Sequence, residues 1–120
     1  MSCTIDEVPV LAWTTVCALG DIVPDTGVCA LVDGEQVAVF RVGQGDLYAI
    51  DNLDPTAHAA VLSRGLVGSL GERVVVASPI TKQHFDLRTG ACLEAPEHSV
   101  RAWPVRLRDD GQVLIGAPAR

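Results

Sequence analysis

The chain has 120 residues and a formal net charge of −6, with 48% apolar and 20% charged residues, a composition typical of one folded domain rather than a disordered chain. The acidic balance argues against nucleic acid as a partner, because a phosphate backbone is bound mainly by clustered Lys and Arg side chains. It argues equally against docking on an anionic membrane surface.

No part of the sequence predicts a membrane span or a secretory leader. A bilayer span needs about 20 apolar residues, whereas the longest apolar runs, 28–32 and 74–77, have the length of a strand. The N-terminal segment is acidic and lacks the basic residues and long apolar stretch of a signal peptide. We therefore expect a cytoplasmic protein.

Short β-rich runs separated by turn residues dominate the first half of the chain. The expected strands, in chain order, are residues 10–17, 28–32, 36–42 and 47–50. An irregular stretch over 18–27 separates the first two. Asp33-Gly34 lies between the second and third runs, and this pair is typical of a hairpin because glycine tolerates the positive φ of a tight turn. Gly43-Gln44-Gly45 predicts the next turn.

The second half also predicts short strands. They are expected at residues 73–77, at 84–88, in a run around 103–108, and in a last run around Val113 and Ile115. Trp103, Val105 and Leu107 share one face of the third run, which predicts that they point inward. The arginines between them, Arg106 and Arg108, are expected to face water. This succession of short strands indicates an all-β antiparallel sandwich or barrel.

One long segment interrupts the strand pattern. Residues 51–70 begin with polar residues, Pro and His, continue with a short apolar stretch, and end in glycines. We expect a long loop with one helical turn near Ala57–Leu62, and loops of this length in a small domain are usually functional. No linker divides the chain, so a single domain is expected over residues 1–120, with its core at about 10–116.

Cysteine and aromatic residues are interpreted mainly as packing residues. The cysteines are Cys3, Cys17, Cys29 and Cys92, and no two form a C-x-x-C pair. We interpret the last three as small buried apolar side chains and Cys3 as part of a loose end. The expected aromatic anchors of the core are Trp13, Phe40, Phe85 and Trp103.

The most specific pattern lies in two loop segments. They are 52–58 (NLDPTAH) and 78–87 (SPITKQHFDL). They resemble the cluster-binding loops of the Rieske iron–sulfur family, in which N-x-C-P-H is followed by C-P-x-H-G-x-x-F-D and a T-G turn. The residues in register are Asn52, Pro55, Pro79, Phe85, Asp86, Thr89 and Gly90. The resemblance implies a Rieske-like antiparallel fold with both loops at one end.

The resemblance places the cluster-ligand positions at residues that are not cluster ligands. These positions are Asp54, Thr56, Ser78 and Thr81. A Rieske cluster takes two thiolates on one iron and two imidazoles on the other, and hydroxyls with one carboxylate do not supply soft sulfur donors. Sliding the register to include His58 or His84 brings no cysteine with it. We therefore expect a Rieske-like fold that binds no [2Fe–2S] cluster.

Two other site chemistries can be drawn from the same residues. His58, His84 and Asp54 could form a two-histidine, one-carboxylate metal site, but we interpret them as unrelated polar loop residues. Ser78 and His84 could suggest a nucleophile and its base, but Pro79 after Ser78 fits a turn rather than a nucleophile elbow. We expect no metal site and no catalytic residue.

The loss of the ligands is itself typical of one group of Rieske-like proteins. The chain resembles the small subunits of assimilatory NAD(P)H-dependent nitrite reductase, most specifically over Ser63-Arg64-Gly65 and 82–87 (KQHFDL). The resemblance implies an accessory subunit, not catalytic alone, with no cofactor of its own. Its partner would be a large subunit that carries FAD, siroheme and a [4Fe–4S] cluster and reduces nitrite to ammonium in nitrate assimilation. The chain itself has no G-x-G-x-x-G dinucleotide loop.

Several basic and polar residues on or near the two loops are candidates for contact with that partner. They are Arg64, Lys82, Gln83, His84 and Arg88. We predict that they form a docking face for carboxylates of the large subunit, and the alternative is an ordinary solvated surface. The alternative function is a stand-alone cluster-less Rieske-like binding module that serves another oxidoreductase.

Overall fold

The computed structural model describes residues 11–118, and within them the chain forms antiparallel strands and three 3₁₀ turns but no α-helix. The strands are β1 (Leu11–Ala18), β2 (Thr26–Val32), β3 (Glu35–Val42), β4 (Asp46–Asp51), β5 (Leu53–Asp54), β6 (Ala59–Ala60), β7 (Leu66–Leu70), β8 (Arg73–Ala77), β9 (His84–Asp86), β10 (Val105–Leu107) and β11 (Gln112–Pro118). The 3₁₀ turns are η1 (Leu19–Asp21), η2 (Leu62–Arg64) and η3 (Pro96–His98). The predicted all-β fold is confirmed, and none of the described helical segments is long or apolar enough to cross a membrane.

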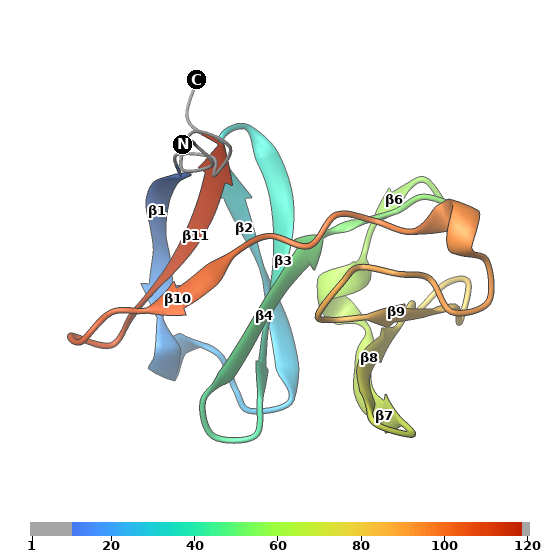
Figure 1. Cartoon of the computed structure of the whole chain (residues 1–120), viewed down its shortest axis with the longest axis horizontal. Coiled ribbons are helices and arrows are strands. Elements are labelled where there is room, and N and C mark those ends of the chain that lie inside the picture. The colour runs from blue at the N-terminus through green and yellow to red at the C-terminus, as the bar shows by residue number, and fades with distance from the viewer. Residues whose placement is uncertain (1–10, 119–120) are drawn as a thin grey trace, which may run out of the picture.

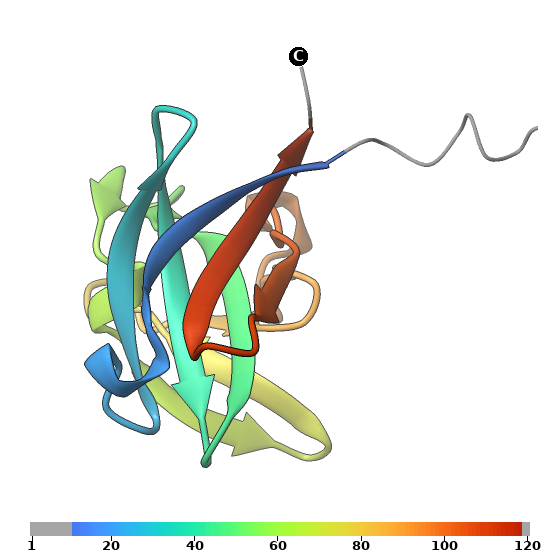
Figure 2. The same ribbon diagram turned by 90° about the vertical axis from the view of Figure 1, so that its left-hand side faces the viewer.

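Two three-stranded sheets form the larger lobe, which we call the base sandwich (Figures 1 and 2). One sheet has the order β1-β11-β10 and the other β2-β3-β4, and all neighbouring strands are antiparallel. Asp33 and Gly34 join β2 to β3 with φ of 53° and 81°, the two positive angles of a type I′ hairpin turn. The hairpin predicted from this pair is therefore confirmed.

Strand β3 is buried on both faces and separates two hydrophobic cores. Val37 and Val39 point into a core shared with β1, β10 and β11, while Ala38 and Phe40 point the opposite way. The second core packs Ala38 and Phe40 of β3 and Ile50 of β4 against residues from later in the chain. These are Leu62, Val76, Phe85, Leu87 and Cys92. Successive residues of a strand alternate between faces, so one strand serves both cores.

The second lobe comprises residues 53–100 and lies beside the base sandwich (Figure 1). It contains the two-stranded sheet β5-β6, the sheet β7-β8-β9 and the turns η2 and η3. The segment 51–70 is therefore not the expected long loop, because 66–70 pair with β8 as strand β7. Its helical turn lies at η2 rather than at 57–62. The sequence Leu-Val-Gly-Ser-Leu of residues 66–70 does not by itself indicate a strand. It forms one here because it pairs with the apolar strand β8.

The strand predicted around 103–108 is divided in the structure. Residues 102–103 pair with β4, whereas 105–107 form β10 and pair with β11. The Trp103 N–H donates to Ala49 O at 2.8 Å, and Ala102 bridges Ile50, so this stretch runs along β4. Strand β10 is left with three residues at the edge of its sheet, and Leu107 is 44% exposed rather than inward-facing.

Of the four expected aromatic anchors, three are buried. Phe40, Phe85 and Trp103 lie in the two cores. Trp13 is only half-buried, and the guanidinium carbon of Arg106 lies 4.4 Å from its ring centroid. Arg106 is exposed, as predicted, and its guanidinium also covers one face of the Trp13 ring.

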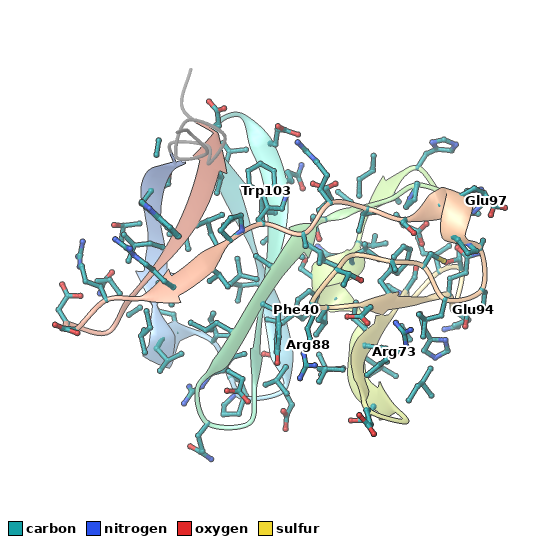
Figure 3. The ribbon with its side chains drawn as sticks, viewed as in Figure 1. Phe40, Arg73, Arg88, Glu94, Glu97 and Trp103 are labelled. Atoms are coloured by element: carbon teal, nitrogen blue, oxygen red, sulfur yellow. The ribbon has the colours of Figure 1, made fainter. Side chains whose placement is uncertain are left out.

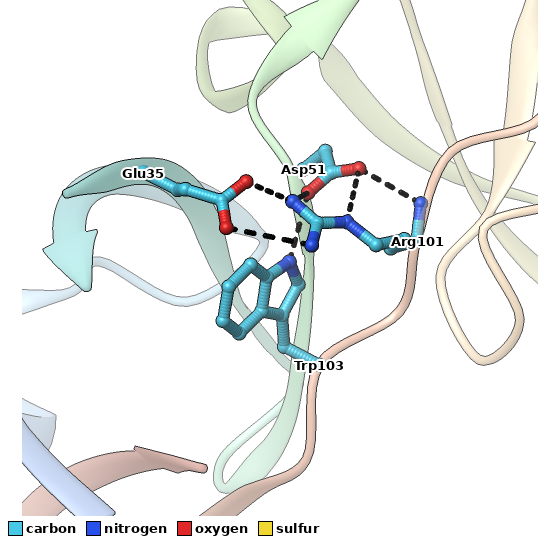
Figure 4. Close-up of polar contacts among 4 residues, drawn as sticks. All are labelled: Glu35, Asp51, Arg101 and Trp103. Atoms are coloured by element: carbon cyan, nitrogen blue, oxygen red, sulfur yellow. Dashed lines mark hydrogen bonds and ion pairs between the residues drawn. The ribbon is translucent and has the colours of Figure 1, made fainter. Parts of the chain in front are cut away.

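A polar junction ties the segment after η3 to the base sandwich (Figure 4). The Asp51 carboxylate accepts hydrogen bonds from the Trp103 indole N–H at 2.9 Å and the Arg101 backbone N–H at 2.9 Å. The Arg101 guanidinium forms ion pairs with Asp51 and Glu35 and lies 4.8 Å from the Trp103 ring centroid. These contacts fix the direction in which the chain returns from the second lobe.

Candidate functional site

Three of the four positions that the Rieske resemblance assigns to cluster ligands meet in the second lobe. Asp54 ends β5, and Ser78 and Thr81 follow β8. The Ser78 hydroxyl donates to Asp54 Oδ2 at 2.5 Å, and the Thr81 hydroxyl donates to the same oxygen at 2.8 Å. Asp54 and Ser78 are completely buried. The two loops that carry these residues, 54–58 and 78–83, are called the tip loops below.

The second carboxylate oxygen of Asp54 is bonded within its own loop. Asp54 Oδ1 accepts the backbone N–H groups of Thr56 at 2.9 Å and Ala57 at 3.1 Å. The carboxylate thus accepts four hydrogen bonds, two from each tip loop. We call Asp54 and these four donors the Asp54 network. It connects loops that are more than twenty residues apart in the sequence.

The Asp54 network holds a buried negative charge that forms no ion pair with a cationic side chain of residues 11–118. Burial raises the pKa of Asp54, but the hydrogen bonds from Ser78, Ala57, Thr81 and Thr56 act against burial and bring the pKa below its ordinary value of 3.8. Several hydrogen bonds to the charged form of a carboxylate stabilise that form. Asp54 is therefore ionised at neutral pH.

The fourth predicted position, Thr56, joins the tip loops through a different contact. Its hydroxyl lies 3.1 Å from Gln83 Oε1 and 2.9 Å from His98 Nδ1. A hydroxyl has one proton to donate, so the consistent arrangement has His98 Nδ1–H donating to Thr56 and Thr56 donating to Gln83. These two hydrogen bonds of Thr56 therefore connect the tip loop 54–58 both to the tip loop 78–83 and to η3.

The backbone of the tip loops is held in tight turns. Lys82 has φ of 63° and His58 has φ of 54°, both in the left-handed region. Lys82 stands where the Rieske pattern has glycine, the residue that adopts this conformation at no steric cost. The turn is retained here although a long side chain occupies the position.

The side chains at the four positions do not fit a Rieske cluster. They offer one carboxylate and three hydroxyls, and the carboxylate is already bonded to two of those hydroxyls. The cluster needs thiolates and imidazoles. Among the described cysteines, Cys92 is buried in the second core, Cys17 is half-buried beside the first core, and Cys29 lies on β2. No cysteine of the described chain supplies the missing sulfur.

One cysteine is placed differently from the prediction, and another cannot be judged. Cys29 is exposed rather than buried, and it accepts a long hydrogen bond from Asn52 Nδ2 at 3.4 Å. The run 28–32 is apolar on both faces, but β2 is the edge strand of its sheet and buries one face only. Cys3 lies outside the described residues.

The structure does not assemble the other two chemistries considered from the sequence. His84 Nδ1 lies 2.6 Å from Glu94 Oε2, while Asp54 is bonded within its network, and no three His, Cys, Asp or Glu side chains in residues 11–118 form a metal-binding group. The Ser78 hydroxyl donates to Asp54 rather than to His84. A histidine base therefore does not activate Ser78.

The predicted docking residues are divided between different parts of the second lobe. Lys82, Gln83 and His84 lie at the tip end of β9, where His84 pairs with Ala77. Arg88 lies beyond the opposite end of β9, and Arg64 ends η2. The docking residues therefore do not form one compact basic patch.

Two of these side chains are already engaged near the tip loops. His84 donates its backbone N–H to Glu94 at 2.7 Å, and its ring also contacts that carboxylate. Both contacts lower the pKa of Glu94. Lys82 Nζ donates to Pro79 O at 3.0 Å and remains exposed.

Two residues of the candidate site, Glu94 and His98, were not singled out from the sequence. Both come from the segment after β9, beyond the two loop motifs, and no motif marks them. Figure 3 shows Glu94 on this segment, and His98 ends η3. Their contacts with His84 and Thr56 depend on how the chain turns back over the lobe. No local pattern in the sequence could have identified them.

A family model described as a Rieske-like [2Fe-2S] domain matches residues 12–116. The nitrite reductase (NADH) small subunit of Salmonella typhimurium is 47% identical over 105 residues, which cover 87% of this chain and 97% of that protein. The NMR structure of the Escherichia coli protein NirD superimposes with a TM-score of 0.84 at 40% identity and covers 92% of this chain and 100% of that chain.

A further similarity lies within a much longer protein. A nitrite reductase NAD(P)H large subunit of Klebsiella oxytoca is 42% identical over 108 residues, which cover 90% of this chain but 11% of that protein. A domain similar to this chain is therefore joined there, in one polypeptide, to a much larger protein of that name.

Proposed function

The chain belongs to the Rieske-like [2Fe-2S] domain family, in the group of nitrite reductase small subunits, and from this premise we propose that it is the accessory small subunit of a cytoplasmic NAD(P)H-dependent nitrite reductase. The large subunit carries out the chemistry in nitrate assimilation, with its own FAD, siroheme and [4Fe–4S] cluster. This chain contributes no catalytic residue and binds neither nucleic acid nor membrane.

One observation carries the proposal. The similarity to proteins named nitrite reductase small subunit runs nearly end to end, over 87% of this chain and 97% of the Salmonella protein. The Klebsiella protein supports the choice of partner, because a similar domain is there part of a chain named large subunit. Covalent fusion of a domain to its partner keeps the two at high effective concentration.

We propose further that the subunit works without a [2Fe–2S] cluster. The Asp54 network supports this step, because the carboxylate and two hydroxyls at the ligand positions satisfy one another. A cluster bound by residues of two loops would hold the loops together, and here Asp54 does so by hydrogen bonds. A chain without the cluster cannot carry electrons through it, so its role is to dock and to order the partner.

The tip loops are the proposed docking element. Ile80 is 55% exposed between the exposed residues Pro79 and Lys82. An apolar side chain beside one positive charge suits a partner pocket that is apolar in its centre and has carboxylates at its rim. Because His84 is paired with Glu94, Lys82 is the basic residue that we expect to contribute most at this end.

The proposal is tested by measuring nitrite-dependent NAD(P)H oxidation by the purified cognate large subunit, with and without this chain. We expect stimulation that saturates at a fixed ratio of the two proteins, together with co-elution on a sizing column. Absence of both effects would reject the accessory role and favour the stand-alone binding module.

Charge-reversal variants locate the docking surface. Lys82→Glu is expected to weaken binding of the large subunit about tenfold or more, because a like-charge contact replaces an attractive one. Arg88→Glu tests the opposite end of β9. The matched control is Arg108→Glu, an equal change of charge on the turn between β10 and β11, far from the second lobe (Figure 1). Equal effects of Lys82→Glu and the control would contradict docking by the tip loops.

A further inference from the structure

Strand β7 is an outer strand that lacks the usual protection of a sheet edge. Its sheet has the order β7-β8-β9, and no other strand in residues 11–118 pairs with its free side. Natural edge strands usually carry charged residues, proline or a bulge that prevents pairing with another chain. Residues 66–70 read Leu-Val-Gly-Ser-Leu and contain neither charge nor proline. The β7–β8 hairpin projects from the lower end of the second lobe in Figure 1.

The register within the hairpin shows which backbone groups point to the free edge. Leu70 pairs with Arg73 across the two-residue turn, so Leu70, Gly68 and Leu66 direct their N–H and C=O groups toward β8. Val67 and Ser69 direct theirs the other way. Four backbone groups, two N–H and two C=O, are therefore available at this edge for another strand.

The solvent-facing side of β7 is apolar. Leu66 is 80% exposed and Leu70 is 45% exposed. They lie on the same face of the strand because they are four residues apart, and Gly68 between them adds no side chain. The strand thus combines free backbone groups with two exposed leucines.

We propose that β7 pairs antiparallel with β7 of a second copy of this chain, about a two-fold axis at Gly68. In this register Val67 lies opposite Ser69 of the second copy, and both direct their backbone groups to the free edge. Four hydrogen bonds can then form, two on each side of the axis. Leu66 lies opposite Leu70 of the second copy on the exposed face, and the two glycines meet at the axis without side chains between them.

Charge complementarity supports a second copy as the occupant. Continued past the ends of β7, the same register brings Arg64, the last residue of η2, near Glu72 in the β7–β8 turn of the second copy, twice by symmetry. Both side chains are exposed, and neither forms an ion pair within residues 11–118. A two-fold interface requires such self-complementarity, because each surface meets an identical one. The pairing uses no residue of the Asp54 network and does not depend on the proposed function.

The test measures the mass of the isolated full-length chain by sedimentation velocity and light scattering over a concentration series into the millimolar range. We expect the mass to rise from one chain toward two. Ser69→Pro removes an outward N–H that pairing with β8 does not use, and proline is tolerated at such edge positions. This variant should remain monomeric with an unchanged circular dichroism spectrum. Leu66→Lys should also remain monomeric, while Leu31→Lys, a matched exposed leucine on β2, should not change association.

A charge swap tests the register itself. Arg64→Glu should weaken the dimer about tenfold, because the two attractive charge pairs that flank the paired strands become repulsive. Glu72→Arg added to it should restore association. A chain that stays monomeric at every concentration, or a dimer insensitive to Ser69→Pro, would overturn the proposal. It would equally be overturned if the edge variants left the isolated chain unchanged and reduced only binding of the large subunit, since the occupant would then be that partner.

Discussion

The base sandwich and the second lobe are stabilised by different interactions. The base sandwich buries valine, isoleucine and alanine side chains between two three-stranded sheets. The second lobe shares one apolar core with β3 and β4 but also buries polar groups. Of the described residues, the buried polar or charged ones are Asn52, Asp54, Ser78 and Asp86. All four lie in the second lobe or at its border.

This difference shows how two parts of one fold can be held together by different kinds of interaction. Apolar packing in the base sandwich does not depend on what lies between the tip loops. The tip loops are irregular, and they need a specific connection to stay together. In this chain a buried carboxylate with four donors provides the connection. Such a network is stabilising only when every buried polar group is satisfied.

The largest expected effect comes from Phe40→Ala, which tests whether the two regions unfold together. Phe40 is fully buried in the core that joins β3 to the second lobe. Loss of a buried phenylalanine typically costs about 4 kcal/mol of unfolding free energy. Urea denaturation followed by fluorescence and by circular dichroism should give one shared transition at lower urea. Two separated transitions would show that the lobes are independent units. Leu31→Ala, at an exposed position, is the control.

The second prediction concerns Asp54→Ala, which removes the connection between the tip loops. Two hydroxyls and two backbone N–H groups would lose their acceptor. Leaving several buried donors unpaired should cost roughly 3 kcal/mol. Hydrogen exchange should accelerate at the backbone amides of Thr56, Ala57 and Thr81 more than at those of β11. Equal acceleration in both lobes would contradict a local role for Asp54.

The third prediction is the acid dependence of the second lobe. The pKa of Asp54 is lower in the folded chain than its ordinary value of 3.8. Its ionised form therefore stabilises the fold fully above that value, and this contribution is lost as pH falls through the folded pKa. Urea titrations between neutral pH and pH about 2 should show a loss of stability that begins near the ordinary carboxyl pKa. Asp54→Asn should have a flatter profile, and an identical slope would contradict the assignment.

The parts of the fold that depend on neighbouring residues are predictable from the sequence. The Asp33-Gly34 hairpin follows from two adjacent residues, and the strand expected at 73–77 is β8 with the same bounds. The resemblance to Rieske proteins located Asp54 and Ser78, but it did not predict that they bond to each other. That contact joins residues 24 positions apart. Strand β7 was likewise missed, because its conformation depends on its partner β8 rather than on its own alternation.

The smallest effect is expected from removing an Arg–Asp ion pair, and each of the two regions contains such a pair to compare. Arg73 bonds Asp86 at 2.9 Å, and Asp86 is buried. Arg73→Ala would remove this ion pair, while the hydrogen bond from the Arg88 N–H to Asp86 at 2.8 Å would remain. The variant should lose about 1 kcal/mol of unfolding free energy. Arg108 also bonds Asp110 at 2.9 Å, but both side chains are half exposed. Arg108→Ala should therefore have no measurable effect, because water solvates both charges. Urea denaturation of both variants measures the difference. Equal losses would mean that burial of Asp86 does not strengthen its ion pair, and the contrast between the two regions would then not extend to their salt bridges.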